Sequence, residues 1–84
     1  MRGRIYAINP NRGMVAIETE NNGYSIFELL NDDNINVGDE VSWTQDTSLG
    51  STILTNKTRD SRFEVYFQNH WVQKHQLRQQ LLIR

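Results

Sequence analysis

The sequence predicts a mainly β protein: a five-stranded Greek-key barrel followed by a C-terminal extension made of a short strand and a helix. Two observations support this prediction. Short runs of β-branched and aromatic residues recur through residues 1–58, separated by Gly, Asn, Asp and Pro. Three runs lie close together and two more follow a polar connection, which is the order of a small Greek-key barrel. We therefore expect the barrel over residues 1–58 and the extension over residues 59–84, packed on the barrel.

The first three strands are expected to form a tight meander over residues 4–8, 14–18 and 24–29. Pro10 and Gly13 lie in the first turn, because proline fixes φ and glycine accepts the positive φ that closes such a turn. The second turn holds Asn21-Asn22-Gly23, and Asn-Gly is the pair that a type I′ hairpin favours.

A polar connection over residues 31–36 is rich in Asn and Asp and separates this meander from the fourth strand. The fourth strand is expected over residues 37–44 and the fifth over residues 51–56, joined by a turn at residues 46–50. Val41 and Trp43 lie two residues apart and therefore share one face of the strand. We expect Trp43 to lie in the core or to be half-buried.

The extension has two patterns. Phe63, Val65 and Phe67 alternate with Glu64, Tyr66 and Gln68, which predicts a short strand. The segment that follows, Trp71-Val72 and then Gln73 to Leu82, contains good helix formers and no breaker, so we expect it to be helical with Leu77 and Leu81 on one side. A single longer helix that begins near Arg62 is the alternative.

Composition limits the possible functions of this chain. Its 84 residues suffice for one domain, and the absence of cysteine excludes disulfides and thiolate metal sites. No apolar run could serve as a signal segment or cross a membrane, so we expect a cytoplasmic protein without membrane contact. The net charge of −1 is unevenly distributed. Residues 1–16 hold three arginines and no acid, residues 17–56 hold eight acids and no base, and bases dominate again beyond residue 57.

Several motifs together resemble the cold-shock domain family over roughly residues 1–57. These are, in order, Gly3-Arg4-Ile5, Asn9, Arg12-Gly13, Ile17, Ile26-Phe27-Glu28 and Val37-Gly38-Asp39-Glu40-Val41. Their order and spacing follow the family's pattern, which implies an OB barrel that binds RNA or single-stranded DNA by stacking bases on aromatic rings.

This chain departs from the family at the stacking rings themselves. Ala7-Ile8 stand where the family has Trp-Phe, Met14-Val15-Ala16 replace Phe-Gly-Phe, and Ile26-Phe27-Glu28 replace Phe-Val-His. Stacking contributes about 1–3 kcal/mol per base, so losing about four rings removes several kcal/mol. Met14 and Ile26 are expected to hold the C-terminal extension instead.

The first functional hypothesis is weak binding of RNA or single-stranded DNA through a basic patch. Its residues are Arg2, Arg4, Tyr6, Arg12, Lys57 and Arg59. Arg4 and Tyr6 share a strand face, and the two basic ends of the chain could meet as one stripe, since phosphate neutralisation supplies most of the affinity. Solvent-facing residues that keep the barrel soluble are the alternative interpretation.

The second hypothesis is a protein-interaction module. Half of the aromatic rings lie in the extension, and Phe63, Tyr66 and Trp71 are its candidate contact residues. The extension would cover the altered barrel face, or bind a protein partner or a second copy of the chain.

Nothing in the sequence predicts an enzyme, a cofactor or a metal site. His70 and His75 lie five residues apart, without cysteine or paired carboxylates beside them. Asp32-Asp33 is expected to be a solvated turn, and no serine has a recognisable histidine and carboxylate partner.

Overall fold

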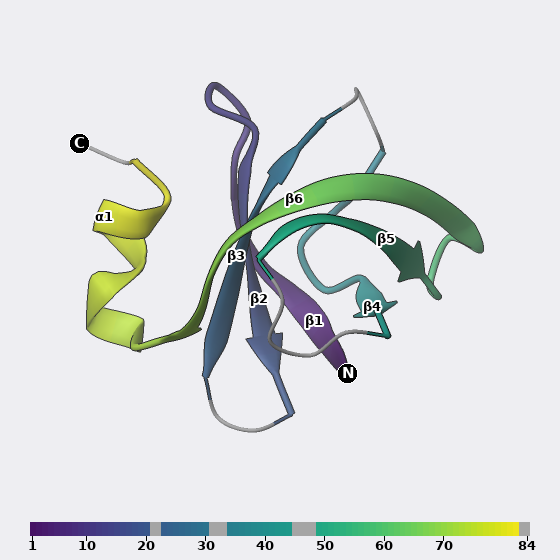
Figure 1. Ribbon diagram of the computed structural model, residues 1–84, viewed down its shortest axis with the longest axis horizontal. Coiled ribbons are helices and arrows are strands. Elements are labelled where there is room, and N and C mark those ends of the chain that lie inside the picture. The colour runs from purple at the N-terminus through teal and green to yellow at the C-terminus, as the bar shows by residue number, and fades with distance from the viewer. Residues whose placement is uncertain (21–22, 31–33, 45–48, 83–84) are drawn as a thin grey trace.

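The computed structural model describes residues 1–20, 23–30, 34–44 and 49–82, and it shows a closed antiparallel β-barrel (Figure 1). The strands are β1 (Arg2–Asn9), β2 (Met14–Thr19), β3 (Tyr24–Leu29), β4 (Glu40–Ser42), β5 (Gly50–Asn56) and β6 (Ser61–Val72). Around the barrel their order is β1-β2-β3-β6-β5-β4. The mainly β barrel is therefore confirmed, with six strands instead of five.

The barrel consists of two three-stranded meanders. β1, β2 and β3 form one, and β4, β5 and β6 form the other. Two seams join them: β4 pairs with β1, and β6 pairs with β3 from Tyr24↔Val72 to Leu29↔Val65. The connection between the meanders passes from β3 to β4, where the sequence predicts a polar segment.

The sixth strand is the segment that the sequence places at the start of the extension. The alternation of Phe63, Val65 and Phe67 indicates a strand, but β6 is longer than expected and pairs with β5 on one edge and β3 on the other. It thereby satisfies two sheet edges that would otherwise expose unpaired backbone groups. The barrel thus continues to Val72, so the helical prediction for Trp71 and Val72 is wrong, and so is the alternative of one long helix from Arg62.

The fourth strand is shorter than predicted. Val37 and Gly38 lie in a turn before it: Gly38 has φ +96°, and Val37 is 62% exposed. Regular β4 pairing covers only Glu40–Ser42. The predicted type I′ turn at Asn21-Asn22-Gly23, the turn over residues 46–50 and the Asp32-Asp33 pair fall wholly or partly outside the described residues.

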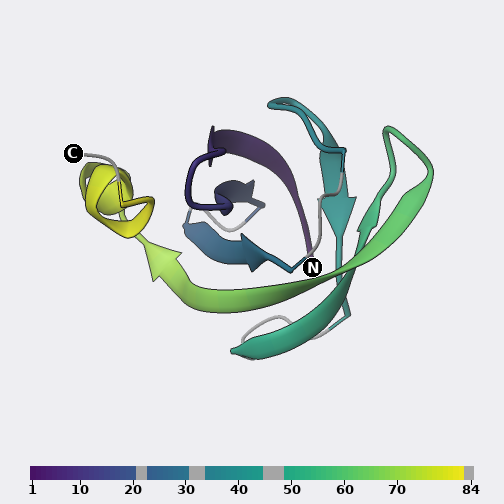
Figure 2. The same cartoon turned by 90° about the horizontal axis from the view of Figure 1, so that it is seen from above.

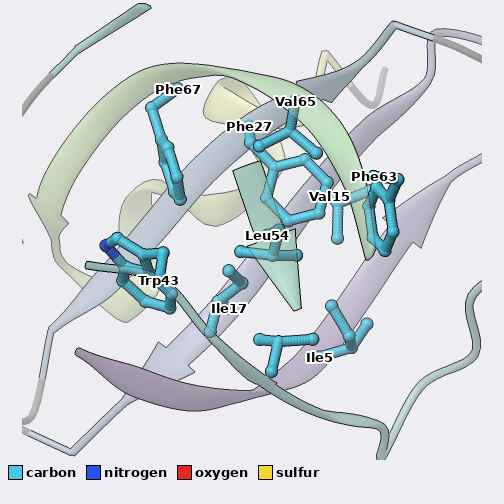
Figure 3. Close-up of a cluster of buried hydrophobic side chains, with 10 residues drawn as sticks. Ile5, Val15, Ile17, Phe27, Trp43, Leu54, Phe63, Val65 and Phe67 are labelled. Atoms are coloured by element: carbon cyan, nitrogen blue, oxygen red, sulfur yellow. The ribbon is translucent and has the colours of Figure 1, made fainter. Parts of the chain in front are cut away.

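Apolar side chains from all six strands fill the barrel (Figure 3). They are Ile5, Val15, Ile17, Phe27, Val41, Trp43, Leu54, Phe63, Val65 and Phe67. The Phe67 ring lies 5.8 Å from that of Phe27 and 5.3 Å from that of Trp43, centroid to centroid. Trp43 is 4% exposed, so its predicted place in the core is confirmed.

A second apolar cluster lies outside the barrel wall, and we call it the outer cluster. It consists of Met14, Ala16, Tyr24, Ile26, Val72, Leu77 and Leu81. The C-terminal segment covers this cluster. It consists of a 3₁₀ turn at Lys74–Gln76 followed by α1 (Leu77–Gln80), and α1 is shorter than the predicted helix, which extended to Leu82. This segment lies beyond the end of β6 and outside the barrel (Figure 2).

The outer cluster confirms that Met14 and Ile26 hold the C-terminal segment. Leu81 is 1% exposed, and its carbonyl oxygen accepts a hydrogen bond from Asn9 Nδ2 at 2.7 Å. Consequently, Met14, Ala16 and Ile26, three wall positions at which the resemblance implies base stacking, are covered by the chain itself.

Candidate binding surface

One end of β1 borders a surface hollow of about 630 Å³, which we call the β1 hollow. Its charged lining consists of Arg2, Arg4, Lys57, Glu18, Glu20 and Glu40, and Tyr24 lies beside them. Three predicted nucleic-acid-binding residues, two from the N-terminus and one from far along the chain, are therefore brought together here.

Close packing of β1 on β2 sets the positions of the two arginines. A Cβ at Gly3 would lie 2.5 Å from both the Glu18 carbonyl oxygen and Ile17 Cγ2, so only glycine fits there. Arg2 and Arg4 flank this glycine and are exposed. Lys57 joins them because β5 ends beside β4, where the Lys57 amide donates to the Glu40 carbonyl oxygen at 2.7 Å.

Carboxylates balance the cations of the β1 hollow. Arg2 Nε lies 3.4 Å from Glu20 Oε2, and Arg4 Nη2 lies 3.0 Å from Glu40 Oε1. The two arginine side chains are 73% and 62% exposed, and exposed ion pairs contribute only about 0.2–1 kcal/mol. These guanidinium groups can therefore exchange a carboxylate for a phosphate at little cost.

Two tyrosines continue the surface beyond the arginines. The Tyr24 hydroxyl donates to Glu18 Oε2 at 3.3 Å, and burial together with the charge of Glu18 raises the pKa of Tyr24. The half-exposed Tyr6 ring meets Tyr24 edge-on at 5.0 Å, and Lys74 Nζ lies 6.0 Å from the Tyr6 ring centroid. No pattern in the sequence points to Lys74, because its approach to β1 depends on how the C-terminal segment packs.

The other two predicted basic residues lie elsewhere. Arg12 is in the turn after β1 and lines a different hollow, with Met14, Glu28 and Leu82 among its neighbours. Arg59 Nε donates to Asp39 Oδ2 at 3.0 Å, so the charge of Arg59 is paired with a carboxylate of the fold. The six residues therefore do not form one patch.

Asp39 is the centre of a buried polar cluster. Its Oδ2 accepts hydrogen bonds from Asn56 Nδ2 at 2.9 Å, from the Asn36 amide at 2.9 Å and from Arg59 Nε. Burial by itself would raise the pKa of Asp39, but these hydrogen bonds outweigh it and lower the pKa below its ordinary value of 3.8. The cluster ties the β3–β4 connection to the β5–β6 turn.

The residues proposed for a protein interface are also separated. Phe63 lies in the barrel core at 8% exposure, so it belongs to no exposed interface. Tyr66 is 45% exposed on the outer face of β6. Two exposed apolar residues belong to the neighbouring strand: Ile53 lies in β5, and Leu49 lies just before it. Trp71 is 53% exposed near the other end of β6. The hypothesis of a protein partner therefore retains Tyr66 and Trp71.

The histidine of β6 makes a polar contact inside the fold. His70 Nδ1 lies 2.8 Å from Ser25 Oγ, and its ring stacks on Phe67 at 4.8 Å. Among the residues that the structure describes, no three His, Asp or Glu side chains are grouped so as to hold a metal ion. Within the same residues, no helix has the length and apolar character needed to cross a bilayer.

Comparison with known proteins gives no relative: the chain matches no protein-family model, no curated protein and no solved structure at a significant level. The fold defines the class, a small closed antiparallel β-barrel with a short C-terminal helix. The cold-shock resemblance stays a prediction.

Proposed function

We propose that this protein is a binding protein without catalytic activity, and that it binds single-stranded RNA or DNA weakly at the β1 hollow. The observation that supports the proposal most is the convergence of Arg2, Arg4 and Lys57 on this hollow, with the Tyr6 ring beside it. Exposed cations next to an aromatic ring are what a nucleic-acid strand requires: the cations neutralise phosphates and the ring stacks on a base.

The balance of charge in the β1 hollow explains why the binding is weak. Glu18, Glu20 and Glu40 offset the three cations, and the whole chain carries −1. The strand must displace two carboxylates from their arginines before phosphates can take their place. Binding is therefore expected chiefly at low ionic strength, where electrostatic attraction is least screened.

Salt dependence tests this proposal. A labelled single strand of about 12 nucleotides, followed by fluorescence anisotropy, should bind at about 50 mM salt. Three phosphate contacts give a slope of about −2 in log K against log salt, so raising the salt to about 200 mM should weaken binding roughly 20-fold. Arg4→Gln should weaken binding at about 50 mM salt and reduce the slope by about 0.7.

Two variants make the test specific. Glu40→Gln frees Arg4 and should tighten binding up to about fivefold, a change opposite in sign to that of Arg4→Gln. Arg62→Gln removes an exposed cation that does not line the β1 hollow, and it should leave the slope unchanged. Absence of binding at about 50 mM salt, or equal effects of Arg4→Gln and Arg62→Gln, would contradict the proposal.

A further inference from the structure

Trp71 has an unusual backbone conformation. Its φ is +58°, in the left-handed region that residues other than glycine and asparagine rarely adopt. It lies in a β-bulge of β6: between the pairs Tyr24↔Val72 and Ile26↔Asn69, β6 advances by three residues while β3 advances by two.

The fold explains the bulge. His70 and Val72 lie two residues apart and would share one face of a regular strand. Instead, His70 stacks on Phe67 of the barrel core, whereas Val72 belongs to the outer cluster. The bulge sends these neighbours to opposite sides of the wall, and the residue between them takes the positive φ.

The fold does not explain why this residue is tryptophan, since glycine or asparagine would adopt the same φ more easily. Trp71 is instead half-exposed to solvent, at 53%. Its ring also packs against the backbone at Gly23. A Cβ at Gly23 would lie 3.3 Å from both Trp71 Cα and Cε3, so the ring edge rests against a position where glycine leaves room.

The strand register places Trp71 at the same end of the barrel as the β1 hollow. Val72 pairs with Tyr24, Tyr24 pairs with Glu18, and Glu18 pairs with Arg4. Three strand spacings of about 4.8 Å therefore separate the strand of the arginines from that of Trp71. A short single strand spans this distance.

We infer that Trp71 is a stacking platform for one base of the strand whose phosphates lie at the β1 hollow. The inference rests on the proposed function and adds a recognition residue outside the cluster covered by α1. An exposed ring that is already seated loses little freedom on binding, which favours its use as a platform.

Fluorescence tests the inference directly, since the chain has two tryptophans and Trp43 is buried at 4% exposure. The single strand of the anisotropy experiment is added without its label until the protein is saturated. This should quench the tryptophan emission that is accessible to iodide, which comes from Trp71. Trp71→Asn should bind the strand about 5- to 150-fold more weakly. It should unfold at the same or a higher urea concentration, because asparagine suits the positive φ. Trp71→Phe should remain within a few-fold of the natural protein.

The controls separate the inference from the function on which it rests. Tyr66→Asn removes the other half-exposed ring of β6 and should leave strand binding unchanged. If the anisotropy rises on binding but Trp71 emission is constant and Trp71→Asn binds equally well, the inference fails and the proposed function stands. If the anisotropy does not rise at all, both fail. Should Trp71→Asn not fold, the change in Trp71 emission on binding decides the matter, and loss of the iodide-accessible emission in Trp71→Phe shows that this signal comes from position 71.

Discussion

Replacing Phe67 with alanine should remove about 3–5 kcal/mol of folding free energy, the range for a fully buried aromatic ring. Phe67 is 0% exposed and lies against Phe27, Trp43 and His70. An 84-residue domain has roughly 4–13 kcal/mol of folding free energy in total, so this variant should lose about a quarter or more of its stability. Urea denaturation followed by Trp43 fluorescence measures the loss.

Tyr66→Ala is the matched control, because Tyr66 precedes Phe67 in β6 but points outward at 45% exposure. Its cost should be below about 1 kcal/mol, as for most exposed positions. Equal midpoints for Phe67→Ala and the natural protein would show that β6 is not a wall of the barrel.

Asp39→Asn should destabilise the protein by about 2–3 kcal/mol at neutral pH, because the charged acceptor for Asn56, Asn36 and Arg59 is lost. The effect should depend on pH. A carboxyl whose pKa is lowered by folding stabilises the native state above its ordinary value of 3.8, and this contribution is lost as the pH falls through the folded value. The difference in free energy of unfolding between Asp39→Asn and the natural protein should therefore shrink below about pH 4.

Urea midpoints at about pH 7 and about pH 3 provide this measurement. Asp60→Asn makes the same chemical change at an exposed position with φ +52°, which both residues tolerate, and should change the midpoint little at either pH. A gap between Asp39→Asn and the natural protein that is as large at low pH as at neutral pH would exclude this role for Asp39.

Local patterns predicted much of this fold because they reflect local physics. The alternation and turn residues of the first meander predicted three strands, and the spacing of Val41 and Trp43 predicted their shared burial. The pairing of β6 was missed, because alternation at Phe63, Val65 and Phe67 indicates a strand but does not identify the edges that it joins. The fourth strand was predicted to begin at Val37, because a hydrophobic residue before a glycine is equally typical of a strand and of a turn.

The binding surface was predictable only in part. Period-two alternation placed Arg4 and Tyr6 on one face of β1, but Arg12 lies at the far end of that strand, about 20 Å or more from Arg2. The carboxylates opposite the arginines follow from register, which the sequence does not specify. The positive φ of Trp71 follows from a bulge needed to bury both its neighbours, and no local signal marks it.

The central claim is that the β1 hollow and Trp71 contact the ligand, while the outer cluster stays closed under α1. Amide and indole NMR shifts on titration with a single strand test this most directly. The claim predicts shifts at Gly3, Arg4 and Lys57 and at the Trp71 indole, with Met14, Ala16 and Ile26 unmoved. Shifts centred on Met14, Ala16 and Ile26, with release of Leu81, would contradict it.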